Sequence, residues 1–303
     1  MKISVSLRSG YPAGDPRATA RNLIERARAA SDAGLAAMFL GDHHNIGGAH
    51  YFQNTPLLGR LLAEWGDAPA GALYLLPLWH PVIVAEQVGT LAALMRGRFI
   101  LQCAIGGDDE QFAGLGVSPR SRPARFEAAL SIIRRLLAGE EVTAGEPYPV
   151  TAARVGLVPQ EPVEVWVGGH APAAIDRAAR MGDGWLAGPG LTAEQAGRLA
   201  ADYLERCDAH GHTPSAVAIR RDIHVGADDN DAEAVAGPVL ARGYRDMDPA
   251  ACIVGGPETV AAKFHALAAA GFTDVVIRHL ADDQQQVLAS FGRLADVRAR
   301  LAA

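Results

Sequence analysis

Several features are missing from this sequence of 303 residues, and each missing feature excludes a class of protein. No apolar run approaches the roughly 18 residues that a membrane-spanning helix needs. Acidic and basic residues are interspersed and give a net charge of −6, so no basic patch is available for nucleic acid. We therefore expect a chain that neither crosses a membrane nor binds nucleic acid.

Cysteine is also scarce. The three cysteines, Cys103, Cys207 and Cys252, are far apart, odd in number and without metal-ligand spacing. Such thiols are typical of reduced cytosolic proteins. The N-terminus goes directly into a predicted strand at residues 3–7 and lacks the charged region and cleavage site of a signal peptide. We expect a cytoplasmic protein without a metal, in which Cys103 is a packing residue.

Strand and helix signals alternate along the whole chain. Apolar and β-branched segments predict about eight strands, at residues 3–7, 36–40, 72–76, 98–105, 163–167, 184–187, 216–225 and 273–278. Apolar residues at helical spacing predict helices at residues 18–32, 55–65, 82–95, 123–137, 173–181, 192–210, 231–241, 257–270 and 283–301. No low-complexity linker divides the chain, so we expect a single domain over residues 1–303, with one irregular insertion around residues 140–160.

Repeated strand–helix units predict a parallel sheet, and about eight of them in a chain of this length fit a (β/α)₈ TIM barrel. The alternative is an open doubly wound sheet, which concentrates its polar residues at one switch point. Here polar and glycine-rich residues follow many different strands, among them residues 42–44, 106–110 and 168–170. This distribution favours the barrel, where the carboxyl ends of all strands converge on one face.

The segment at residues 163–174 combines a predicted strand, a double glycine and a helix start. Gly168 and Gly169 allow a sharp turn and a close approach to a ligand, and Pro172 suits the first helical turn. The free N–H groups of such a helix start bind anions, above all phosphate. The alternative is that the two glycines only form a tight turn between strand and helix.

Three residues after the predicted strands could exchange protons. Adjacent side chains in an extended segment point in opposite directions, so His43 and His44 are poorly placed to bind one metal ion. An acid–base role for one of these histidines is an alternative to a purely structural place in the loop. Asp108 could accept a proton or cap the short helix that residues 110–115 suggest.

The sequence resembles the luciferase-like monooxygenase family, which also contains deazaflavin-dependent oxidoreductases. The resemblance covers nearly the whole chain. It depends on five segments in the family's order, at residues 39–44, 75–82, 97–102, 166–169 together with 178–185, and 256–260. It implies a barrel that binds a flavin or deazaflavin at the carboxyl ends of its strands.

The resemblance also implies which residues hold the cofactor, namely Asp42, Leu75, Leu76, Pro77, Gly106, Gly107, Val167, Gly168, Gly169 and His170. The double-glycine turn would hold the cofactor phosphate. The segment at residues 75–77 would run beside the ring system, and Gly106 and Gly107 would leave room for it. The resemblance implies His43 and Asp108 as catalytic residues, and His44 is a further catalytic candidate because of its imidazole. Asp108 falls where some deazaflavin-dependent relatives carry a longer, proton-accepting glutamate.

Three functions follow as hypotheses. The first is an FMN-dependent monooxygenase that acts on a small organic substrate and is served by a separate flavin reductase. The second is a reductase or dehydrogenase that exchanges a hydride with coenzyme F420, a deazaflavin. The third is a non-catalytic flavin-binding protein. Because the family commonly forms dimers through barrel helices, we also expect a homodimer.

Overall fold

The structure is a computed structural model that describes residues 1–302. The chain divides into two compact units. The first unit contains Met1–Arg8, Arg17–Met38 and the chain from Trp166 onward, and the second contains Ser9–Pro16 and Phe39–Val165. The single domain expected over residues 1–303 stays a prediction.

Parallel strands form the sheet of the first unit. Its strands are β1 (Lys2–Leu7), β10 (Gly184–Ala187), β11 (Ala216–Val225), β12 (Ile253–Gly255) and β13 (Asp274–His279). β13 pairs with β1 on one side and β11 on the other, and β11 pairs in turn with β10 and β12. Most residues of these strands are buried, as expected when a parallel sheet is covered on both faces.

Six helices alternate with these strands: α1 (Pro16–Asp32), α6 (Pro172–Met181), α7 (Ala193–Ala209), α8 (Asp229–Ala241), α9 (Pro257–Ala269) and α10 (Gln284–Ala302). Local sequence explains where several of them begin. Thr192 and Gln195 form a reciprocal capping box at the start of α7, and Asp228 caps α8 by accepting from the Asp231 backbone N–H.

The second unit contains β5 (Ala70–Leu75) and β6 (Phe99–Ala104), which pair in parallel from Ala70 and Phe99 to Leu75 and Ala104. Its helices are α2 (Asn54–Leu61), α3 (Pro81–Ala93), α4 (Asp109–Gly114) and α5 (Arg122–Leu137). β3 (Met38–Leu40) and β9 (Glu164–Gly168) lie where the chain passes between units. Short 3₁₀ turns cover Leu62–Glu64, Leu76–Leu78, Pro119–Ser121 and Pro249–Ala251.

Hydrogen bonds order the main sheet as β10-β9-β6-β5-β3-β1-β13-β11-β12, and β10 also pairs with β11. Of these nine strands, β12 lies outside the ring, so the remaining eight close on one another. With helices between the strands this is a (β/α)₈ barrel. The predicted fold class is confirmed, and the alternative of an open sheet is wrong because of the β10–β11 pairing.

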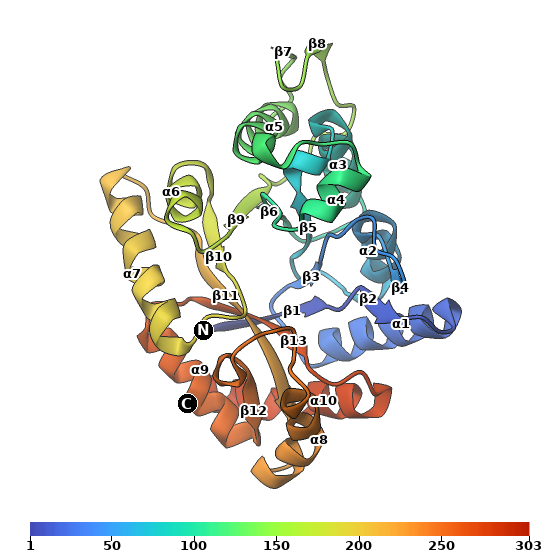
Figure 1. Ribbon diagram of the computed structural model, residues 1–303, viewed down its shortest axis with the longest axis vertical. Coiled ribbons are helices and arrows are strands. Elements are labelled where there is room, and N and C mark those ends of the chain that lie inside the picture. The colour runs from blue at the N-terminus through green and yellow to red at the C-terminus, as the bar shows by residue number, and fades with distance from the viewer. Residues whose placement is uncertain (303) are drawn as a thin grey trace. The chain divides into compact units, whose positions relative to one another are not determined.

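The structure adds elements that the sequence patterns did not predict. The insertion around residues 140–160 contains an antiparallel hairpin of β7 (Val142–Ala144) and β8 (Val150–Ala153), which projects beyond α5 in Figure 1. Gly10–Pro12 (β2) and Ala49–Tyr51 (β4) pair antiparallel and form a separate two-stranded sheet. Strands of three or four residues are too short to show alternation, so these segments read as loops.

The core of each unit is apolar. Cys103 is fully buried in β6, which confirms that it is a packing residue. Within residues 1–302, none of the helices combines the length and apolarity that crossing a lipid bilayer would require.

A helical glycine lets the insertion approach α3. A methyl group on Gly89 would lie 2.2 Å from the carbonyl oxygen of Leu157, which is a backbone atom and has little freedom to move. Gly59, in α2, makes a natural comparison, because a methyl group there would meet only Leu91 Cδ2 at 3.9 Å.

We predict opposite effects when these two glycines are replaced by alanine. Gly89→Ala should lower the free energy of unfolding by about 1–3 kcal/mol through overpacking. Gly59→Ala should leave it unchanged or raise it by up to about 1 kcal/mol, because alanine is the better helix former. Denaturant unfolding of both variants measures the difference, and equal effects would contradict the close approach of Leu157 to α3.

Candidate active site

Asp42 connects the ends of two strands of the second unit. It follows β3 by two residues and its carboxylate is buried. Asp42 Oδ2 accepts hydrogen bonds from the Leu75 backbone N–H and from Trp79 Nε1, both at 2.8 Å. Because Leu75 ends β5, this carboxylate fixes the segment after β3 against the segment after β5.

His44 is enclosed beside Asp42. Its side chain is 13% exposed, and its Nε2 lies 3.1 Å from Asp42 Oδ1, although the two groups are not aligned for a hydrogen bond. The ring meets the edge of Trp79 with centroids 5.2 Å apart. Its backbone N–H donates to Gln111 Oε1 at 2.8 Å. These contacts indicate that His44 packs beside the Asp42 carboxylate and supports its position.

His43 is the more accessible histidine and approaches a different carboxylate. Its side chain is 35% exposed, with Nε2 at 3.9 Å from Asp108 Oδ2 and the ring of Tyr51 at 5.7 Å between centroids. Burial lowers the pKa of His43 below its ordinary value of 6.5; Asp108 and Asp42 oppose this effect, and His44 adds to it. At neutral pH His43 is therefore a neutral imidazole, which can accept a proton.

Asp108 caps α4, the helix that the sequence suggested. Its carboxylate accepts from the Glu110 backbone N–H at 2.9 Å and from Gln111 Nε2 at 3.2 Å. Burial acts to raise the pKa of Asp108, but these hydrogen bonds and nearby His43 outweigh it and hold the pKa below its usual range. The group is thus an anion at neutral pH and favours the protonated form of His43.

The segment expected beside a cofactor ring is held by its backbone. The side chains of Leu75, Leu76 and Pro77 are buried. The Leu76 carbonyl accepts from the Tyr148 hydroxyl at 3.2 Å, and the Pro77 carbonyl accepts from Arg125 Nε at 2.8 Å. Tyr148 lies between the two strands of the insertion hairpin, so the insertion supports this segment.

Glycines after β6 leave space in the second unit. A methyl group on Gly107 would meet no atom within 4 Å. Gly106 has a φ of 75°, which disfavours any other residue, and a methyl group there would lie 3.1 Å from the ring of Phe112. The site therefore has open space at Gly107 and a conformational need for glycine at Gly106.

The double-glycine turn lies in the first unit. Val167 is buried, Gly168 and Gly169 are half-buried, and His170 is exposed. Gly169 has a φ of 144°, and a methyl group on it would lie 2.6 Å from the Ala174 Cβ. Ala171, the residue that caps α6, provides no side-chain hydrogen bond to the helix start. The first N–H groups of α6 are thus not satisfied by a capping side chain.

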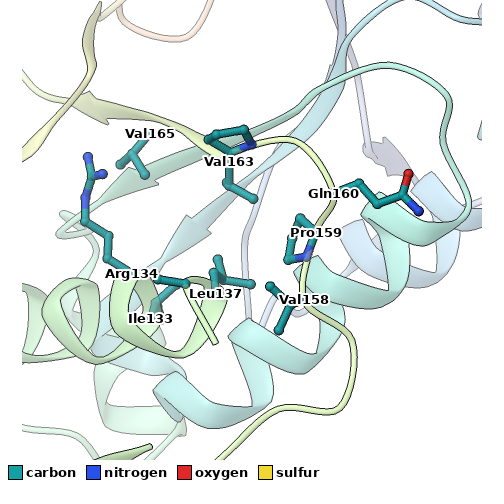
Figure 2. Close-up of a pocket in the computed structure, with 10 residues that line it drawn as sticks. Ile133, Arg134, Leu137, Val158, Pro159, Gln160, Val163 and Val165 are labelled. Atoms are coloured by element: carbon teal, nitrogen blue, oxygen red, sulfur yellow. The ribbon is translucent and has the colours of Figure 1, made fainter. Parts of the chain in front are cut away.

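A hollow of about 380 Å³ in the second unit holds none of these residues. Figure 2 shows it between Ile133, Arg134 and Leu137 of α5 and the segment from Val158 to Gln160. Its lining is mainly apolar and contains no histidine or carboxylate, so it has no group that could exchange a proton.

Two polar residues that support the site were not predicted from the sequence. The indole N–H of Trp79 holds the carboxylate of Asp42. Gln111 connects the Asp108 carboxylate with the backbone of His44. The position of Gln111 three residues after Asp108, on the first turn of α4, was the only available signal.

A model of the luciferase-like monooxygenase family matches residues 1–274. Among curated proteins, the chain is 33% identical over 190 residues to an F420-dependent glucose-6-phosphate dehydrogenase of Beutenbergia cavernae; the match covers 59% of this chain and 56% of that protein. A second such dehydrogenase, from Microbacterium testaceum, is 30% identical over 203 residues, with 63% of this chain and 60% of that protein covered. The chain thus spans less than two thirds of the length of these relatives.

Solved structures resemble the chain over its whole length. A monooxygenase from Streptomyces bottropensis has 20% identity and a TM-score of 0.83, with 100% of both chains covered. An F420-dependent secondary alcohol dehydrogenase with an F420–acetone adduct has 18% identity and a TM-score of 0.80, with 99% of each chain covered. The FMN complex of a Pseudomonas putida Baeyer–Villiger monooxygenase has 18% identity and a TM-score of 0.77, with 98% of this chain and 97% of that one covered. At these identities the likeness shows a shared fold.

We predict that Asp42 is needed for stability as well as for the site. Asp42→Ala would leave two donors, the Leu75 N–H and Trp79 Nε1, without their acceptor, at a cost of about 1–3 kcal/mol for each buried donor. Asp109→Ala is the control, because the Asp109 side chain is 75% exposed and pairs only with Arg122 at the surface. Denaturant unfolding with tryptophan fluorescence should show a large loss for Asp42→Ala alone, and similar losses in both variants would contradict the prediction.

Proposed function

Because the chain belongs to the luciferase-like monooxygenase family and is an oxidoreductase of that family, we propose that it transfers a hydride between coenzyme F420 and a small organic alcohol or carbonyl compound. The observation that carries this proposal is the state of His43. It is a neutral, partly exposed imidazole whose Nε2 lies 3.9 Å from the anionic carboxylate of Asp108. This arrangement suits a base that takes a hydroxyl proton.

The chemistry assigns a distinct task to each residue. A bound deazaflavin supplies the carbon centre that accepts or gives the hydride. In the oxidation direction, the substrate C–H bond gives up the hydride, a C=O bond forms, and His43 Nε2 takes the hydroxyl proton. Asp108 then stabilises the imidazolium from 3.9 Å. In reduction His43 returns the proton to the carbonyl oxygen.

Asp42 and Trp79 position this base. Two hydrogen-bond donors hold the carboxylate of Asp42. Because Asp42 directly precedes His43 in the chain, the backbone at His43 has little freedom to move. Fixed orientation of the acceptor nitrogen lowers the entropic part of the barrier. His44, enclosed against Trp79, is assigned to this supporting set.

The residues proposed for cofactor binding fit a phosphorylated cofactor. Gly168 and Gly169 allow close approach of a phosphate to the start of α6, where no capping side chain competes for the N–H groups. Gly106 and Gly107 provide space after β6, and Leu75, Leu76 and Pro77 provide a buried apolar segment. We propose that Val167 and His170 flank the phosphate turn.

F420 is preferred to FMN because of the curated relatives. The matched relatives at 30–33% identity are named as F420-dependent dehydrogenases. The second candidate remains an FMN-dependent monooxygenase, which the family's description favours. The phosphate turn suits either cofactor, since both carry a phosphate.

A binding titration separates these candidates. We predict saturable binding of F420, followed by its fluorescence, and weaker binding of both oxidised and reduced FMN. The control is Gly169→Val, which should weaken binding because its side chain would meet Ala174. Preferred binding of FMN would instead favour the monooxygenase. Binding of F420 without turnover of any alcohol or carbonyl compound would favour a non-catalytic binding protein.

The pH dependence tests the role of His43. In the oxidation direction, activity should be present above the pKa of His43 and fall as the pH drops through it, at a value below 6.5. Asp108→Asn removes a carboxylate that raises this pKa, so the acidic limb should move to lower pH. Asparagine still caps α4 well.

Two further variants complete this test. His43→Ala should lower kcat by about 10²–10⁴-fold with F420 binding retained. His210→Ala, which removes a histidine of similar exposure near Asp176, should have no effect. An unchanged pH profile in Asp108→Asn, measured with an NMR titration of His43, would contradict the assignment.

A further inference from the structure

A cluster of charged residues lies on neighbouring strands of the first unit, apart from every residue assigned above. Asp222 of β11 is paired in register with Arg278 of β13, and Arg220 lies two residues before Asp222. Residues two apart on a strand share a face, so these three side chains lie on the same side of the sheet. Tyr244 and Arg245, which follow α8, complete the cluster.

Asp222 is the centre of this cluster and its side chain is completely buried. Asp222 Oδ2 accepts from Arg245 Nη1 at 2.8 Å and from the Tyr244 hydroxyl at 3.0 Å. Arg220 Nε lies 3.3 Å from Asp222 Oδ1, without the alignment of a hydrogen bond. Arg278 also interacts electrostatically with Asp222, so one carboxylate is the counter-charge of three guanidinium groups.

The charges do not balance. Three arginines against one aspartate leave an excess of two positive charges. Arg8 is also near Arg278, but it forms an ion pair with Asp282 and adds no net charge. Arg221 points elsewhere and donates to the Pro189 carbonyl. Within residues 1–302, no second carboxylate contacts Arg220, Arg278 or Arg245.

Some donors of the cluster are also unused. Arg220 Nε, Arg220 Nη2 and Arg278 Nε are buried atoms without a hydrogen-bond partner among the described residues. Burial lowers the pKa of Arg220 to about 10, and Asp222 opposes this effect, so the group remains charged at neutral pH. Burial acts to raise the pKa of Asp222, but Arg220, Arg278 and Arg245 hold it below its usual range.

A purely structural ion-pair network would account for a cluster with equal numbers of positive and negative charges, but not for this one. Burying charge is costly unless each charge is paired and hydrogen-bonded, so a network built for stability has no use for two extra guanidinium groups. An anion would both neutralise the excess and use the free donors. Access exists, because the side chains of Arg220 and Arg245 remain 19% and 40% exposed.

We propose that Arg220, Arg278 and Arg245 form an oxyanion subsite that binds a phosphate or carboxylate group of the substrate. Planar guanidinium groups match the geometry of such oxyanions and form charge-assisted hydrogen bonds with them. Asp222 and Tyr244 position the arginines and do not contact the anion. The assignment of the anion to the substrate rests on the proposed function, and the subsite itself does not.

The test uses the full chain without coenzyme and inorganic phosphate as the probe, at constant ionic strength, followed by calorimetry. Wild-type protein should bind phosphate saturably. Arg245→Gln should weaken this binding about tenfold, the usual effect of losing one charge-assisted hydrogen bond. Arg245 is chosen because it is partly exposed and leaves Asp222 with two arginines. Arg242→Gln is the matched control, since it removes the same charge from an exposed position three residues away and should change the dissociation constant less than twofold.

A second variant guards against a loss of structure. Arg220→Lys keeps the charge but loses the planar fork, so phosphate binding should be weakened yet retained, with an unchanged circular dichroism spectrum. The subsite would be refuted if wild-type protein did not bind phosphate saturably, or if Arg242→Gln weakened binding as much as Arg245→Gln. Acetate as a second probe shows whether a carboxylate is also accepted, and binding of either probe with the same variant pattern supports the subsite.

The source of the anion is decided by measuring coenzyme binding in the same variants. If Arg245→Gln weakens phosphate binding but leaves F420 binding unchanged, the subsite belongs to the substrate. If F420 binding weakens by the same factor, the anion is part of the coenzyme and the substrate assignment is wrong. Because the phosphate titration contains no coenzyme, its outcome does not depend on whether the protein uses F420 or FMN.

Discussion

The buried carboxylate of Asp42 is the interaction on which the second unit's site depends. A buried anion is tolerated only when donors surround it, and here the donors are the last N–H of β5 and an indole from the turn that follows. The need to satisfy one charge thereby fixes two strand ends and an aromatic ring. His43 and His44 follow directly in the chain, so their different surroundings are a consequence of the same anchor.

The two histidines show how adjacent identical residues acquire different properties. His44 is enclosed against Trp79 and Asp42, while His43 is directed toward Asp108 and remains partly exposed. The alternation of side chains along an extended segment separates them. Partial burial without a strong ion pair then keeps His43 neutral, whereas a closer carboxylate would have kept it protonated. Acid–base suitability here depends on the 3.9 Å separation as much as on residue type.

The fold was largely predictable because the alternation of strand and helix patterns repeats along the whole chain, in both units. All the predicted barrel strands are present, with boundaries shifted by a few residues, such as β3, which begins at Met38 and not at residue 36. The two small antiparallel sheets, β2–β4 and β7–β8, were missed because their strands have only three or four residues. In the site, Asp42, His43 and Asp108 could be singled out by residue type and by position after a strand. The hydrogen bond from Trp79 to Asp42 spans 37 positions and leaves no local pattern, so the sequence alone does not reveal this partner of Asp42.

The hydroxyl of Tyr148 joins a surface hairpin to the backbone at Leu76. Insertions of this kind are usually free to change in length and sequence, since few interior groups depend on them. This insertion places a hydrogen-bond donor in the interior, so a change in the tip between β7 and β8 would also affect the buried residues that the tip covers. For protein engineering, the hairpin is therefore a module that can be shortened or exchanged only if its tyrosine is kept in place.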